Sequence, residues 1–180
     1  MDARDAARLI EPAVTVGGVW ADLGAGTGTF TIALAGLLGP RGQVYAVERD
    51  ARALAALHAL ATDMHGDRAR ITILRGDFTG PLELPALDGV LLANSLHFVP
   101  DEQQSPLLAR LALSVAATGA ILIVEYDNRP RSRWVPFPAS LTRLETLSRD
   151  AGLSSPVLLG RRESEFGGTM YAARLERGVA

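Results

Sequence analysis

Short apolar runs alternate along this chain with longer segments in which apolar residues recur at helical spacing. Such alternation is typical of βαβ units, in which helices connect parallel strands and pack on the faces of their sheet. We therefore expect an α/β fold built around a mostly parallel sheet. The expected strands are residues 18–23, 43–48, 71–74, 89–93, 120–125, 157–161 and 168–176.

The helical segments are bounded by recognisable start and stop signals. Gly39 and Pro40 close the first of them, because a glycine followed by proline ends a helix. Asp50 is a suitable N-cap for the second. The expected helices are residues 27–38, 51–64, 101–117 and 139–150.

The C-terminal part of the chain departs from this alternation. Residues 126–138, here named the arginine loop, hold three prolines and three arginines and are expected to be irregular. The last two expected strands are separated by about six residues, which is too short for a helical crossover. We therefore expect these two strands to pair as an antiparallel hairpin.

Composition and charge limit the function classes that remain open. The 180 residues suit a single domain over 1–180, and all 18 basic residues are arginine while cysteine is absent. Schiff-base lysines, thiolate nucleophiles and cysteine-bound metals are thereby excluded, and no metal site is expected. The net charge of −2 disfavours a nucleic-acid partner. No apolar run approaches the roughly 18 residues that span a bilayer, so we expect a cytoplasmic protein that does not contact a membrane.

The most informative segment is a glycine cluster between the first strand and the first expected helix. Gly24, Gly26 and Gly28 would let the chain turn sharply and let a ligand approach the backbone. Glu48 ends the second strand, 20 residues after Gly28, where a carboxylate can accept the hydroxyls of a ribose. Together these residues predict a site for an adenosine-containing ligand.

Two details favour a positively charged ligand over a dinucleotide. Thr29 stands where the dinucleotide fingerprint has its third glycine or alanine. Asp22 precedes the glycine cluster, and its carboxylate would repel a pyrophosphate but attract an ammonium or sulfonium group. An NAD(P)-dependent Rossmann oxidoreductase is therefore disfavoured, although it stays open as an alternative.

Four segments in this order resemble the class I S-adenosylmethionine-dependent methyltransferases, and among them the small-molecule branch of ubiquinone and menaquinone biosynthesis. They are the DLGAGTG of residues 22–28, the VYAVE of residues 44–48, the RGDF of residues 75–78 and the LDGVLLANSLH of residues 87–97. The resemblance implies a Rossmann-like three-layer sandwich with a seven-stranded, mostly parallel sheet and an antiparallel C-terminal hairpin. It also implies S-adenosyl-L-methionine as the cofactor.

The resemblance assigns the methionine part of the cofactor to the glycine turn. The backbone of Asn94 would reach the methionine ammonium, and Asp22 would lie close to the positive charge. The turn residues that would cradle the cofactor are Gly24, Ala25, Gly26 and Thr27.

The adenosine part is assigned to the ends of the next two strands. Glu48 would hold the ribose hydroxyls, and its neighbour Arg49 is also predicted to bind the cofactor. Asp77 would accept a hydrogen bond from the adenine amino group, and the backbone of Phe78 would meet an adenine ring nitrogen. The Asp77 carboxylate is a suitable acceptor for an amino group. An aspartate after a glycine is also common in turns, so a purely structural role for Asp77 is the alternative.

No particular catalytic residue is obligatory for methyl transfer, because the cofactor supplies the reactivity and the protein mainly supplies orientation. His97, just after the fourth strand, is the candidate general base because its ordinary pKa lies near 6.5, and a structural role is the alternative. A catalytically silent S-adenosylmethionine-binding module therefore remains open as a second alternative function.

The expected acceptor is a small molecule. Only about 17 residues precede the first strand, so we expect either an open acceptor site or one closed by the arginine loop, by a partner subunit of a homo-oligomer or by a large substrate. The loop itself is interpreted either as a lid for an anionic or aromatic acceptor or as a solvated loop pinned by its aromatic residues.

Overall fold

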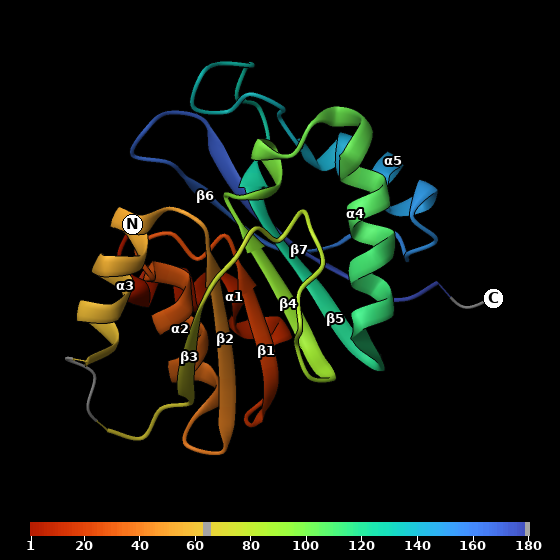
Figure 1. Ribbon diagram of the computed structural model, residues 1–180. Coiled ribbons are helices and arrows are strands. Elements are labelled where there is room, and N and C mark those ends of the chain that lie inside the picture. The colour runs from red at the N-terminus through yellow and green to blue at the C-terminus, as the bar shows by residue number, and fades with distance from the viewer. Residues whose placement is uncertain (63–65, 179–180) are drawn as a thin grey trace.

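The computed structural model describes residues 1–62 and 66–178. Within these ranges seven strands form one mixed sheet in the order β3-β2-β1-β4-β5-β7-β6 (Figure 1). Strands β1 to β5 run parallel, and β7 is antiparallel to both β5 and β6. The expected fold and its C-terminal hairpin are confirmed. The strands are β1 (Gly18–Leu23), β2 (Gly42–Glu48), β3 (Arg70–Arg75), β4 (Leu87–Ala93), β5 (Val115–Tyr126), β6 (Val157–Glu163) and β7 (Thr169–Leu175).

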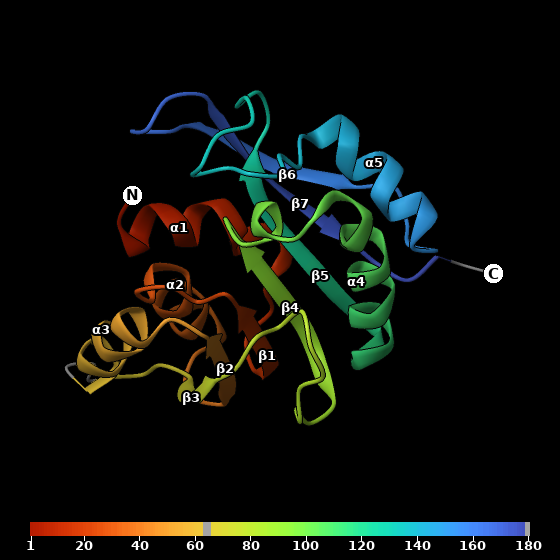
Figure 2. The same ribbon diagram turned by 45° about the horizontal axis from the view of Figure 1, so that its top comes forward.

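Helices cover both faces of the sheet (Figures 1 and 2). Helices α1 (Ala3–Ile10), α2 (Thr29–Leu38) and α3 (Ala51–Thr62) lie on one side, and α4 (Asp101–Ser114) and α5 (Leu141–Asp150) lie on the other. Short 3₁₀ turns, η1 (Glu11–Ala13) and η2 (Leu96–Phe98), follow α1 and β4. None of the helices in the described part of the chain combines the length and apolar character that a membrane crossing requires.

The core is split into two main layers by the sheet. Successive residues of β5 face opposite sides, so Ile121 and Ile123 pack with the layer under α4 and α5, whereas Leu122 and Val124 pack with the layer under α1 and α2. A strand buried on both faces needs apolar residues at every position. This explains why the sheet strands appear in the sequence as short continuous apolar runs.

Helix α1 lies in a segment for which no element was predicted. Asp2 caps it by accepting a hydrogen bond from the Asp5 amide at 2.9 Å, and Ala6, Leu9 and Ile10 are buried. This cap, followed by apolar residues at helical spacing, is a helix signal present in the sequence. The segment before β1 therefore adds a helix to the layer that contains α2.

Two predicted helix ends are corrected by local backbone geometry. Helix α2 begins at Thr29 instead of residue 27, because Gly28 has a φ of 97° and occupies the N-cap. Helix α4 ends at Ser114 instead of residue 117, since Val115 is extended and pairs with Leu87 of β4. The predicted end of the 51–64 helix falls outside the described residues.

Candidate functional site

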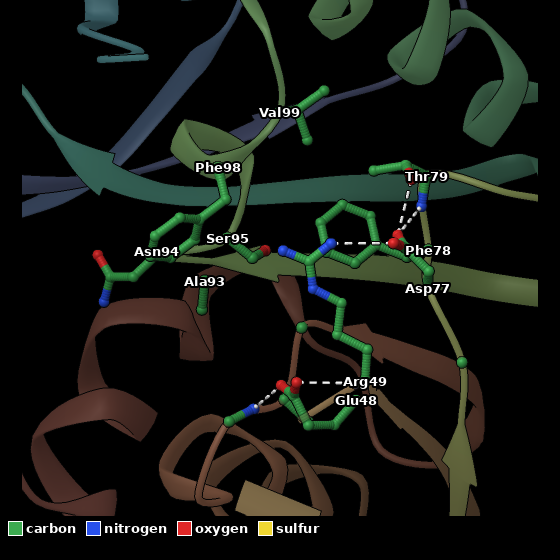
Figure 3. A pocket seen from close by; sticks show the side chains of 14 residues that line it. Glu48, Arg49, Asp77, Phe78, Thr79, Ala93, Asn94, Ser95, Phe98 and Val99 are labelled. Atoms are coloured by element: carbon green, nitrogen blue, oxygen red, sulfur yellow. Dashed lines mark hydrogen bonds and ion pairs between the residues drawn. The ribbon is translucent and has the colours of Figure 1, made fainter. Parts of the chain in front are cut away.

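A cavity of about 340 Å³, here named the central cavity, opens at the carboxyl ends of β1, β2 and β4 and at the segment after β3 (Figure 3). Strand β1 is flanked by β2 and β4, so the strand order reverses there, which is where ligands bind in open α/β sheets. The cavity is lined by Gly24, Ala25, Gly26, Glu48, Arg49, Gly76, Asp77, Phe78, Thr79, Ala93, Asn94, Ser95, Phe98 and Val99.

The glycine turn after β1 forms one wall and is anchored to the neighbouring strand. The amides of Gly24 and Ala25 both donate to the carbonyl of Val47, at 2.9 and 3.0 Å. A Cβ atom on Gly24 would lie 2.6 Å from the Cβ of Ser95, and Gly24 has a φ of 79°. Only glycine fits this position, which explains the first glycine of the motif.

Glu48 is held rigidly at the end of β2. Its Oε2 accepts from the Gly26 amide at 2.8 Å, and its Oε1 accepts from the amides of Arg49 and Asp50 at 2.7 and 2.8 Å. A carboxylate has about four acceptor positions, so Oε2 retains capacity for one further donor from a ligand. Because three backbone amides hold the carboxylate in place, the direction from which a ligand donor can approach Oε2 is fixed as well.

Asp77 offers a second carboxylate on the opposite side of the cavity (Figure 3). It accepts from the Thr79 hydroxyl at 2.7 Å, from the Thr79 amide at 2.9 Å and from the Arg49 guanidinium at 2.9 Å. The hydrogen bonds from Thr79, followed by the attraction of Arg49, keep the pKa of Asp77 below its ordinary value. Asp77 is therefore ionised and ready to accept a hydrogen bond from a ligand amino group.

Asp22, which is predicted to lie close to the positive charge of the cofactor, lies outside the lining of the central cavity. Its carboxylate is buried, with 1% of the residue exposed, and accepts from the Thr31 hydroxyl at 2.6 Å. Burial raises the pKa of Asp22 to about 6. Thr27 is exposed and likewise does not line the cavity.

Asn94 follows β4 in a backbone conformation that few residues adopt. Its φ is 54°, in the left-handed region that asparagine tolerates better than most side chains. Its amide nitrogen donates to the Val124 carbonyl at 2.8 Å. Its side-chain Oδ1 is buried and has no hydrogen-bond partner within the described residues, and Figure 3 shows this side chain directed away from Asp77.

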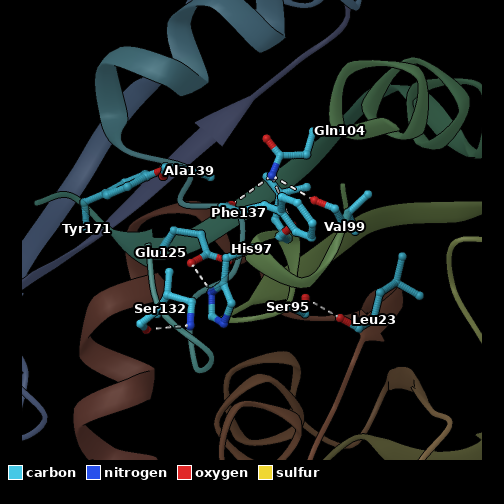
Figure 4. A network of polar contacts seen from close by, with 12 residues as sticks. Leu23, Ser95, His97, Val99, Gln104, Glu125, Ser132, Phe137, Ala139 and Tyr171 are labelled. Carbon is cyan, nitrogen blue, oxygen red and sulfur yellow. Dashed lines mark hydrogen bonds and ion pairs between the residues drawn. The ribbon is translucent and has the colours of Figure 1, made fainter. Parts of the chain in front are cut away.

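His97 is buried in η2 and paired with an acid from the end of β5 (Figure 4). Its Nδ1 lies 2.7 Å from Oε2 of Glu125, and its backbone amide donates to Oε1 at 3.1 Å. Since a carboxylate only accepts, Nδ1 donates this hydrogen bond, and in a neutral imidazole the lone pair then lies on Nε2. His97 does not line the central cavity, although its neighbour Phe98 does.

The arginine loop combines a fixed part with an exposed part. Val135 is buried, and the Phe137 amide donates to the His97 carbonyl at 3.0 Å while Gln104 donates to the Phe137 carbonyl at 3.0 Å (Figure 4). Trp134 remains 63% exposed, with the Arg133 guanidinium 4.6 Å above its ring. The C-terminal end of the loop is thus held by hydrogen bonds and burial, whereas its tip is exposed to solvent.

Several functional neighbours have no motif of their own in the sequence. Thr79, Phe98 and Val99 line the cavity because they follow within two residues of the marked segments, and Ser95 lies inside the fourth segment without having been singled out. Glu125 could have been predicted as a functional neighbour from the sequence. It ends a continuous apolar strand, and a buried acid at such a position needs a polar partner.

Comparisons with known proteins agree with this architecture. A sequence profile described as a methyltransferase domain matches residues 21–119. No curated protein sequence matches the chain. Among solved structures, the CcbJ methyltransferase from Streptomyces caelestis is 17% identical with a TM-score of 0.75, and the match covers 99% of this chain and 90% of that protein.

Two further structures match over almost the whole of this chain. The mitomycin 7-O-methyltransferase MmcR is 20% identical with a TM-score of 0.70, and the match covers 97% of this chain and 53% of MmcR. CalO1, a methyltransferase of calicheamicin biosynthesis solved with S-adenosylhomocysteine, is 23% identical with a TM-score of 0.70, over 97% of this chain and 54% of its own. The chain thus spans about half the length of MmcR and CalO1.

Proposed function

The chain belongs to the family of methyltransferase domains, and from this membership we propose that it transfers a methyl group from S-adenosylmethionine to a small-molecule acceptor. The observation that carries the proposal is the central cavity, which places a fixed carboxylate, an ionised aspartate and a glycine turn around one space of about 340 Å³.

The residues present suit an adenosine-containing cofactor. Glu48 Oε2 keeps room for one ribose hydroxyl beside the Gly26 amide. Asp77 is an acceptor placed for the adenine amino group, with the ring of Phe78 as an apolar surface next to it. Arg49 spans the cavity to reach Asp77, so we propose that its guanidinium shifts onto the cofactor when adenine takes this acceptor.

When bound, S-adenosylmethionine supplies an electrophilic methyl group on a positively charged sulfur. The chain's own contribution is to hold that group and to favour its charge. Gly24, Ala25 and Gly26 allow close backbone approach, and Asn94 closes the cavity at the end of β4. Asp22 lies behind the turn as a buried negative charge, which favours a nearby cation.

We propose that His97 takes the acceptor's proton, directly or through one water molecule. During transfer, the acceptor's lone pair forms the bond to the methyl carbon, the carbon–sulfur bond breaks with its electron pair on sulfur, and the acceptor proton must leave. The Glu125 carboxylate orients the imidazole through Nδ1, so the free lone pair on Nε2 is the proton acceptor.

A small-molecule acceptor is supported by two of the similar solved structures, since MmcR is named for mitomycin and CalO1 for calicheamicin biosynthesis. The resemblance to the ubiquinone and menaquinone branch stays a prediction. Homo-oligomer formation stays a prediction as well.

Calorimetric titration with S-adenosylhomocysteine and, separately, with NADH tests the cofactor. We expect S-adenosylhomocysteine to bind and NADH not to bind. Glu48→Ala should weaken the binding by roughly 1–3 kcal/mol, because a charge-assisted hydrogen bond to the ribose is lost. The exposed Glu102→Ala serves as the matched control and should leave the affinity unchanged.

Binding of NADH without binding of S-adenosylhomocysteine would replace the proposal with the oxidoreductase alternative. Equal affinity for S-adenosylhomocysteine in folded Glu48→Ala and in the control would remove Glu48 from the site.

A further inference from the structure

A second, smaller cavity of about 190 Å³ lies next to the central cavity and shares Asn94 with it. This side cavity is bounded by the start of α2, the end of β5 and the hairpin of β6 and β7. Its apolar walls come from Phe30, Tyr126, Phe166 and Met170. Aromatic rings together with a thioether form a surface that suits a flat aromatic ligand.

Two polar groups of the side cavity have no partner within the described residues. The Asn94 Oδ1 atom is buried without a hydrogen bond, and the Tyr126 hydroxyl makes none, although 8% of Tyr126 is exposed. A buried oxygen without a donor costs stability that a bound donor would restore. The cavity is therefore complementary to a ring that carries a hydrogen-bond donor.

The charged residues of the cavity are already engaged. Arg162 pairs with Asp5 at 2.6 Å, Glu163 accepts from the Thr169 hydroxyl at 2.9 Å, and the Met1 ammonium pairs with Glu165 at 3.0 Å. Such pairing leaves the lining without a dedicated partner for a charged substituent. An uncharged ring is favoured over a carboxylate or an ammonium group.

The size of the side cavity limits the ring system. A cavity of about 150 Å³ is enough to hold benzene, so about 190 Å³ holds one six-membered ring with a small substituent. A fused two-ring system is larger, so we expect it to fit this space less well than a single ring.

We infer that the side cavity is the acceptor site, and that the acceptor is a single-ring phenol whose hydroxyl donates to Asn94 Oδ1. This inference rests on the proposed function. The phenol oxygen gains the methyl carbon as the carbon–sulfur bond breaks and the electron pair stays on sulfur. The hydroxyl turns from Asn94 Oδ1 to a water molecule, which takes its proton and passes one on to His97. Asn94 holds the hydroxyl at the boundary between the two cavities, where both substrates meet.

Fluorine NMR on the protein saturated with S-adenosylhomocysteine tests the inference with three probes. We expect saturable binding of 4-fluorophenol. Fluorobenzene, which has the ring without the hydroxyl, should bind about three- to tenfold more weakly because one hydrogen bond is lost. The two-ring 6-fluoro-2-naphthol should also bind more weakly than 4-fluorophenol.

The Tyr126→Phe variant tests whether the probes bind in the side cavity or elsewhere on the protein. Tyr45→Phe is its matched control. Tyr45 lies in β2, outside the lining of the side cavity. The phenol oxygen, while it donates to Asn94 Oδ1, can also accept a hydrogen bond from the Tyr126 hydroxyl. Loss of that hydroxyl should therefore weaken 4-fluorophenol binding about three- to tenfold and leave fluorobenzene binding unchanged. The control variant should bind both probes as the wild type does.

The binding of S-adenosylhomocysteine, measured first, distinguishes the two possible failures. If it binds but 4-fluorophenol does not, the acceptor inference is wrong while the proposed function stands. Displacement of 4-fluorophenol by S-adenosylhomocysteine would show that the side cavity belongs to the cofactor site, which also overturns the inference. Equal binding of the phenol in the Tyr126 and Tyr45 variants, or tighter binding of the naphthol, would contradict the assigned site.

Discussion

Asp22 carries a carboxylate where water does not reach it. The residue lies within the buried stretch of β1 and has the Thr31 hydroxyl as its hydrogen-bond partner. Burial disfavours the charged form and raises the pKa of Asp22 from 3.8 to about 6. The folded chain tolerates this cost at neutral pH, where the carboxylate can favour a cation bound in front of the glycine turn.

Replacement of Asp22 by Asn should change how stability depends on pH. Between about pH 4 and pH 6 the folded wild type keeps a proton that the unfolded chain has lost. Its free energy of unfolding should therefore fall with rising pH relative to Asp22→Asn, by about 3 kcal/mol in total. Urea unfolding of both proteins from pH 4 to pH 8 measures the difference, and parallel curves would show that Asp22 is not desolvated as described.

The site residues differ in how far the sequence predicts them. Glu48 ends β2 and Asp77 lies two residues after β3, so their meeting at one sheet edge follows from a parallel sheet. The ion pair of Arg49 with Asp77 and the pair of His97 with Glu125 each join residues 28 positions apart. Local patterns do not encode such pairings, which depend on how the strand ends and loops pack.

At the scale of elements, α4 holds the segment that carries Asp77 and Phe78. Arg110 of α4 donates to the backbone carbonyls of Phe78 and Gly80. This segment has no helix or strand of its own between β3 and β4. Its position over the central cavity therefore depends on contacts with α4 and on the turn at Asp77.

Arg110→Ala should loosen this segment and weaken S-adenosylhomocysteine binding about five- to twentyfold, because hydrogen bonds from a charged donor are lost. Arg177→Ala is the matched control, since Arg177 also donates to two backbone carbonyls, those of Ala112 and Val115 at the C-terminal end of α4, and does not contact the segment with Asp77. Both variants should lose stability to a similar extent. Calorimetry should show weaker binding in the first only, and equal affinities would mean that Arg110 has a purely structural role.

Element boundaries were predictable where local chemistry decides them. Asp50 caps α3 as expected, with the amides of Arg52 and Ala53 donating to its carboxylate. The start of β5 was not predictable, because Val115 leaves the helix to pair with β4, a contact with a segment distant in the sequence. Tertiary pairing overrode the helical pattern of residues 101–117 there.

At the scale of the whole molecule, the arginine loop lies beside the side cavity and is anchored to α4. Arg129 lies 4.7 Å from the ring centre of Tyr126, which lines the side cavity, and Arg131 pairs with Asp101. The loop tip around Trp134 is the exposed part. These contacts make the loop a candidate cover for the acceptor.

Replacing Arg129, Arg131 and Arg133 together with alanine should weaken 4-fluorophenol binding several-fold, because the cover over the side cavity loses its contacts. Affinity for S-adenosylhomocysteine should not change, since none of the three lines the central cavity. Fluorine NMR and calorimetry provide the two measurements.

The matched control for that variant removes the same charge from surface positions remote from the loop. Arg41, Arg68 and Arg149 are exposed and suit this purpose. If both triple variants bind 4-fluorophenol equally well, the loop is a solvated segment with no part in acceptor binding.

The central claim is that this chain moves a methyl group. The most direct test incubates the purified protein with S-adenosylmethionine labelled in its methyl group and a small-molecule extract, and then follows the label. Transfer of label to a small-molecule product by the wild type, and about tenfold less transfer by Glu48→Ala at limiting cofactor, is the predicted result. If the protein binds S-adenosylhomocysteine but the label stays on the cofactor in every fraction, the chain is a cofactor-binding module and the claim is contradicted.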